Sequence, residues 1–157
     1  MRLLVFAAML AASGLAGTAQ GATNYPVWQG EAFLTAVTTA CAPTGTAAVG
    51  DYFRVVYRPK IASTDPAEGL SFLAARSTYL VISTASSARL QGSGTYSGRY
   101  ISSRAQTGST TGASQLSVSP LPITASTGTV SINGTLTNFY AVTGCDVTFS
   151  AAFTPRP

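Results

Sequence analysis

Residues 145–153, Cys-Asp-Val-Thr-Phe-Ser-Ala-Ala-Phe, alternate between two kinds of side chain. One set is apolar and includes the cysteine: Cys145, Val147, Phe149, Ala151 and Phe153. The side chains between them are polar or small. Because successive side chains of a strand point to opposite faces, this pattern is typical of a half-buried β-strand. We therefore expect residues 145–153 to form the last strand of a β-sheet.

The other cysteine, Cys41, ends a second run, Phe-Leu-Thr-Ala-Val-Thr-Thr-Ala-Cys, at residues 33–41. We expect this run to lie antiparallel to the last strand, with Cys41 opposite Cys145. Two further pairs then meet on the same face: Val37 with Phe149 and Phe33 with Phe153. A slip of one residue would move every side chain to the other face. This register predicts that the first and last strands are neighbours joined by a disulfide.

The N-terminal residues have the features of a targeting segment. Residues 1–19 begin with a positive charge at Arg2, continue with an almost uninterrupted apolar run over residues 3–17, and end with small side chains. This pattern predicts a signal peptide, and the apolar run is too short to span a bilayer comfortably. We expect residues 20–26 to be a flexible lead-in and residues 27–154 to be a single β domain. The mature chain is predicted to be exported to the periplasm or the extracellular space, without a transmembrane segment.

Composition agrees with an exported chain and limits its partners. Two cysteines in an exported protein most simply pair with each other. The loop between them covers most of the mature chain, so the chain-entropy model allows at most about 4–5 kcal/mol of stabilisation. Only 9% of residues are charged, and the net charge is +4 at pH 7. Attraction to an anionic polymer is therefore weak and screened by salt, which predicts no specific nucleic-acid partner.

The remaining patterns predict about seven strands and no long helix. The expected strands are 27–41, 51–58, 70–83, 90–104, 115–119, 129–142 and 145–153. Adjacent terminal strands favour a single small antiparallel barrel. A two-sheet β-sandwich is the alternative, because it can also seat its terminal strands side by side.

Four segments carry more local expectations. Residues 65–68 have the composition of a helix start, and residues 66–76 fit either a helix or a strand, with the strand favoured. Residues 106–114 are expected to be a flexible loop, since they have nothing to bury. The dipeptide Asn133-Gly134 fits a tight hairpin turn or a strand with a glycine bulge equally well.

The absence of histidine limits the chemistry most strongly. It removes the usual general base, the commonest metal ligand and the Ser–His and Cys–His nucleophile pairs. A disulfide also removes thiolate chemistry and zinc–thiolate sites. Of the carboxylates, Glu31 and Asp146 lie at opposite ends of the expected strand pair, so they do not form a glycosidase pair. The sequence predicts no enzyme, no catalytic residue, no metal and no cofactor.

Four residues are candidates for ligand binding. Arg54 and Arg58 are expected to share a strand face with Tyr52, and arginines beside an aromatic ring can hold a phosphate, an acidic sugar or single-stranded nucleic acid. The structural alternative is a solvated face on which the tyrosine packs against arginine stems. Trp28 belongs to a group of aromatic side chains that can line a sugar site or the mouth of a barrel. The expected partner is an unidentified protein or glycan.

Two strands resemble those of fimbrial subunits of the chaperone–usher kind. The resemblance lies in residues 33–41, which end in a cysteine, and in Val-Thr-Phe-Ser-Ala-Ala-Phe at residues 147–153. In those subunits the second cysteine lies much nearer the first, and a tyrosine usually lies close to the C-terminus, whereas this chain ends Thr-Pro-Arg-Pro. The resemblance covers these two strands only and implies an assembly protein completed by a donated strand.

Three hypotheses for function follow. The first is a non-enzymatic exported β domain that acts by surface contact. The second is a small-ligand barrel with an aromatic-lined mouth, and the third is a fimbrial-subunit-like assembly protein.

Overall fold

The computed structural model describes residues 27–44, 47–74, 78–83, 90, 96–102 and 105–156. The strands are β1 (Trp28–Val37), β2 (Tyr52–Arg58), β3 (Gly69–Ala74), β4 (Thr78–Ser83), β5 (Tyr96–Ser102), β6 (Ala105–Ser119), β7 (Val130–Thr137) and β8 (Val147–Pro155). Two short 3-10 helices, η1 (Thr39–Thr44) and η2 (Phe139–Ala141), follow β1 and β7. The expected signal peptide and lead-in lie outside the described residues.

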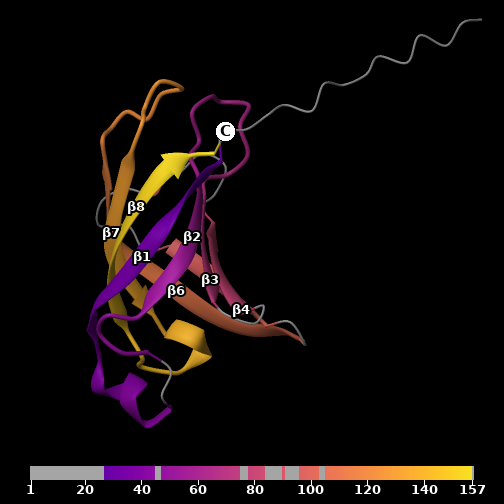
Figure 1. The fold of residues 1–157 in the computed structure, drawn as a ribbon. Coiled ribbons are helices and arrows are strands. Elements are labelled where there is room, and N and C mark those ends of the chain that lie inside the picture. The colour runs from indigo at the N-terminus through magenta and orange to yellow at the C-terminus, as the bar shows by residue number, and fades with distance from the viewer. Residues whose placement is uncertain are drawn as a thin grey trace, which may run out of the picture.

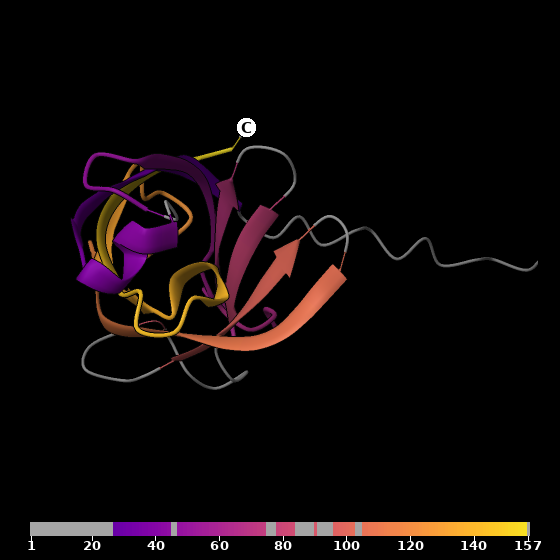
Figure 2. The same ribbon diagram turned by 90° about the horizontal axis from the view of Figure 1, so that it is seen from below.

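The strands form one curled antiparallel sheet (Figures 1 and 2). Each strand pairs with the next one in the chain, and β8 pairs with β1, so the order of hydrogen-bonded neighbours returns to its start. Figure 1 shows β8 beside β1. The all-β class and the adjacency of the first and last strands are therefore confirmed.

The predicted disulfide is also present. Cys41 and Cys145 are bonded, with their Cα atoms 4.6 Å apart, and both are fully buried. Cys41 lies in η1 and not at the end of β1. The Thr38 hydroxyl supports this corner by donating to the Gly144 carbonyl at 2.7 Å and accepting from the Asp146 N–H at 2.9 Å. The disulfide thus joins the segment after β1 to the segment before β8.

The expected register between these strands is wrong. Val37 lies opposite Val147, and Phe149 lies opposite Leu34. Two features cause the difference. Cys41 lies in η1, so counting along an extended strand from Cys41 misplaces Val37. A bulge between Leu34 and Ala36 adds one residue, which moves the side chains on its far side, including Phe33, to the other face. Before the bulge, the interior face of β1 carries Trp28, Ala32 and Leu34. Phe33 points outward, so its expected pairing with Phe153 does not occur.

The interior is packed with aromatic side chains from both halves of the chain. The rings of Phe72 and Phe149 have their centroids 4.9 Å apart, and those of Tyr57 and Phe153 are 5.6 Å apart. Phe139 of η2 adds a ring 5.7 Å from Phe53. Burying each such side chain stabilises the fold by roughly 1.5–3 kcal/mol. The alternating pattern of β8 thus faces this interior as expected.

Residues 69–83 form two strands instead of the one long strand expected. Gly69 pairs with Ser83 and Ala74 with Thr78, so β3 and β4 make a hairpin. Because this one expected strand is two strands, the described residues contain one strand more than the seven expected. The strand alternative for residues 66–76 is correct for β3, because Leu70 and Phe72 are buried while Leu73 is exposed.

The expected flexible loop at residues 106–114 is part of the long strand β6. Its backbone pairs with β5 up to Ala113, and from Gly112 onward it pairs with β7. Backbone pairing satisfies main-chain polar groups whatever the side chains are, so a Ser/Thr/Gly-rich segment can be a strand when a neighbouring strand pairs with it. The composition of residues 106–114 was therefore a poor guide to their structure.

Two turn predictions are corrected as well. Residues 65–68 do not start a helix, because the Asp65 carboxylate accepts hydrogen bonds from the N–H groups of Ile61 and Ala62 at 2.8 and 2.7 Å, behind it in the chain. Asn133-Gly134 is not a hairpin turn, and it lies inside β7 as the strand alternative predicted. The bulge is in the partner strand β6, and a Cβ atom at Gly134 would clash with Leu116, which packs over it.

Candidate binding surface

The outer face of β1 and β2 carries a group of exposed aromatic and charged side chains. Residues 29, 31 and 33 point outward from β1, and residues 52, 54 and 58 from β2. The register places Glu31 beside Arg54 and Phe33 beside Tyr52. Neighbouring side chains on one face of an antiparallel pair interact directly. The outer face therefore combines an aromatic pair with a pair of opposite charges.

The aromatic pair consists of Phe33 and Tyr52. Their ring centroids are 6.4 Å apart, with the planes tilted by 42°. Phe33 is 49% exposed and Tyr52 is 69% exposed. On β3, Leu73 is 40% exposed and lies opposite Arg54. Exposed apolar side chains that gather in this way mark interaction surfaces more often than scattered ones do.

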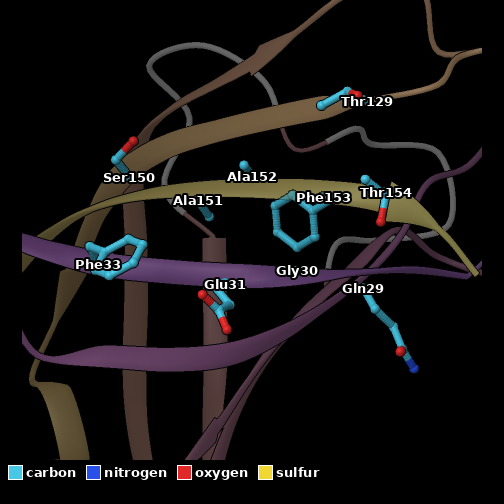
Figure 3. Close-up of a pocket in the computed structure, with 10 residues that line it drawn as sticks. All are labelled: Gln29, Gly30, Glu31, Phe33, Thr129, Ser150, Ala151, Ala152, Phe153 and Thr154. Atoms are coloured by element: carbon cyan, nitrogen blue, oxygen red, sulfur yellow. The ribbon is translucent and has the colours of Figure 1, made fainter.

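A hollow of ≈ 350 Å³, here called the β1–β8 hollow, lies beside the aromatic pair. Figure 3 shows Phe33 at one end, with Gln29 and Thr154 at the other. Between these ends the lining includes the Gly30 backbone and the small side chain of Ala152. A Cβ atom at Gly30 would clash with the carbonyl oxygen of Ala152, so glycine is required for the close approach of β1 to β8.

A second hollow of ≈ 160 Å³ lies toward β2 and β3. Its lining includes Arg54, Val56 and Leu73, and it shares Gln29 and Gly30 with the β1–β8 hollow. The two hollows therefore meet at the same two residues of β1. Together with the aromatic pair they make a continuous, uneven surface.

The sequence-predicted site residues fall on two sides of the sheet. Tyr52, Arg54 and Arg58 share the exposed face of β2, as expected. Trp28 lies on the opposite side, in the interior, where it is 1% exposed. Its indole N–H has no hydrogen-bond partner within the part of the chain that the structure describes.

Sequence reasoning missed Glu31 and Phe33 as surface residues. The expected register placed Phe33 on the interior face, because it counted alternate positions back from Cys41 without a bulge. A usable signal was present, since Trp28, Ala32 and Leu34 form a competing apolar set on the other face. This set contains Trp28, the largest side chain of the strand, which favoured it as the interior face.

A second polar cluster is buried. Glu68 is 4% exposed and accepts hydrogen bonds from the Tyr57 hydroxyl and from the Leu90 N–H, the latter at 2.7 Å. Buried polar groups need such partners, and these bonds connect β2, the segment before β3 and residue 90. We interpret the cluster as structural.

The loop carboxylates are held by backbone groups. Asp51 accepts from the Ala48 N–H at 2.8 Å, and Asp146 accepts from the Asn138 N–H at 3.1 Å. Among the described residues, no group of three acidic, cysteine or histidine side chains is arranged to hold a metal ion. In the same residues, no helix combines the length and apolar character needed to cross a membrane.

The chain matches no protein-family model, and comparisons with curated proteins and with solved structures give no match.

Proposed function

We propose that this protein is an exported, non-enzymatic β domain that acts by surface contact through the outer face of β8, β1 and β2. The observation that carries the proposal is the exposed aromatic pair, Phe33 and Tyr52, beside the β1–β8 hollow. An apolar pair at this exposure does little for the fold, so a partner is the simplest reason for it. The disulfide agrees with an oxidising compartment such as the periplasm or the extracellular space.

The proposal includes a small closed barrel as the scaffold. It is supported by the pairing order, in which β8 returns to β1. β1 and β8 each have a partner on both sides. Donated-strand assembly needs an unpaired strand position, so these pairings favour surface contact over the fimbrial-like alternative. Hydrogen exchange tests the scaffold, because a closed barrel needs every neighbouring pair of strands, so the amides that β5 and β6 direct at each other must be protected as well as those of β1.

Retention on cell-envelope fractions tests the proposed function. The wild-type mature chain is compared with the double variant Phe33→Ala/Tyr52→Ala and with Leu121→Ala, which changes an exposed apolar side chain outside both hollows. We expect the double variant alone to lose retention, with an unchanged unfolding midpoint. Equal retention of all three proteins, or turnover in a broad hydrolase panel, would contradict the proposal.

The alternative function is binding of a small ligand inside the sheet. One observation favours it, namely the buried Trp28 N–H without a described partner. An interior ligand with an acceptor atom would supply that partner. Because Trp28 is the only tryptophan of the chain, its fluorescence reports on this site alone. A change in Trp28 emission when extracted small molecules are added back would support the alternative, and an unchanged emission would count against it.

A further inference from the structure

The β1–β8 hollow offers side chains to a ligand but no free backbone edge. β1 is paired with both β2 and β8, and β8 is paired with both β1 and β7. An extended peptide that binds by adding a strand needs unpaired backbone N–H and C=O groups. A ligand here must therefore be recognised through side chains alone, which favours a rigid molecule over an extended peptide.

The side chains around the hollow are of two complementary kinds. Phe33 presents an exposed ring face at one end. Gln29 supplies an amide, and Ser150 and Thr154 supply hydroxyl groups that are also exposed. An apolar ring with polar groups spread along the hollow suits a ligand that has an apolar face and many hydroxyl groups. A sugar ring has both, since its C–H bonds form one face and its hydroxyls surround the edge.

Charge argues for a neutral ligand. Within the linings of the two hollows, the charged side chains are Glu31 and Arg54. They carry opposite charges and are direct neighbours across β1 and β2, so they largely offset each other. An anionic ligand would gain little from Arg54 while Glu31 lies beside it. This differs from the acidic sugar or phosphate expected from Tyr52, Arg54 and Arg58 alone.

Size and shape favour part of a larger glycan. The volume of ≈ 350 Å³ lies at the lower end of the range of small-molecule sites, about 300–1,000 Å³, and the hollow is shallow. The adjoining hollow of ≈ 160 Å³ offers space for a neighbouring unit. From these features we propose that the surface binds a neutral carbohydrate, with one sugar ring against Phe33 and its hydroxyl groups bonded to Ser150 opposite, and with a further sugar unit reaching Gln29 and Thr154 at the other end. This inference rests on the proposed function and specifies its partner.

A binding experiment with defined oligosaccharides tests the inference. The probes are neutral hexose and N-acetylhexosamine oligomers, with uronic-acid oligomers as the charged comparison. We expect affinity for a neutral probe that is unchanged between low and high salt and falls about tenfold or more in Phe33→Ala. Phe33→Tyr keeps the ring and is expected to retain binding, and Leu121→Ala is the surface control. Phe33 is half exposed, so the variants are expected to fold, which their unfolding midpoints check.

The outcomes separate this inference from the proposed function. If only the uronic-acid oligomers bind, and if this binding is lost at high salt, the proposal of a neutral carbohydrate ligand is wrong. If no oligosaccharide binds while envelope retention still depends on Phe33 and Tyr52, the carbohydrate inference is wrong and surface contact stands. If neither depends on these residues, both proposals are wrong.

Discussion

The two faces of β1 and β2 carry similar side chains in opposite environments. On the inner face, Trp28 and Tyr57 are at most 1% exposed. On the outer face of the same strands, Phe33 and Tyr52 are 49% and 69% exposed. The inner ring of Tyr57 packs against the buried ring of Phe153, whereas the outer rings of Phe33 and Tyr52 lie beside each other in solvent. The comparison shows that residue type alone does not distinguish a core position from a surface position, because the face of the strand decides.

Removal of the buried disulfide is expected to have the largest effect on the free energy of unfolding. Replacing both cysteines, Cys41→Ser with Cys145→Ser, removes a bridge over 104 residues. The loop-closure model sets the loss at about 4–5 kcal/mol as an upper value. Urea unfolding with and without reductant measures it, and the double variant should no longer respond to reductant. An unchanged midpoint on reduction of the wild type would contradict this expectation.

A matched pair of phenylalanine truncations compares the two faces directly. Phe149→Ala removes a buried ring 4.9 Å from Phe72 and is expected to cost about 3–5 kcal/mol. Phe33→Ala on the outer face should change the free energy of unfolding by no more than about 0.5 kcal/mol. Chemical denaturation measures both. Equal losses would mean that Phe33 is part of the core.

Two tyrosine variants compare the inner and outer faces again, because each variant removes a single hydroxyl group. Tyr57→Phe removes the donor to the buried Glu68 carboxylate and should cost about 1–3 kcal/mol. Tyr52→Phe removes an exposed hydroxyl and should be nearly neutral. Thermal unfolding of the two variants at one pH gives the difference. A neutral Tyr57→Phe would show that Glu68 does not need this bond.

The smallest effect is expected from the charge pair on the outer face. A double-mutant cycle with Glu31→Gln and Arg54→Gln should give a coupling of about 0.2–1 kcal/mol that shrinks as salt is added. Both side chains are exposed, so screening by water keeps the coupling small. A coupling above this range, insensitive to salt, would indicate a pair shielded from solvent.

The interior of β8 was predictable from the sequence, and the outer face of β1 was not. The alternation over residues 145–153 has no bulge, so its apolar face is the buried face. In β1 the bulge between Leu34 and Ala36 breaks the count from Cys41, which sent Phe33 to the wrong side. Of the candidate site, Tyr52, Arg54 and Arg58 were found because β2 is regular. Glu31 and Phe33 required the observed register.

The amino-acid sequence by itself determined the all-β class, the pairing of Cys41 with Cys145 and the adjacency of the terminal strands. These features depend on local alternation and on two cysteines that have no other partner. The tertiary structure decided the register of β1, the inclusion of residues 106–114 in a strand and the position of the hollow. These depend on bulges and on backbone pairing between distant segments, and neither has a dependable signature in the order of side chains along one strand.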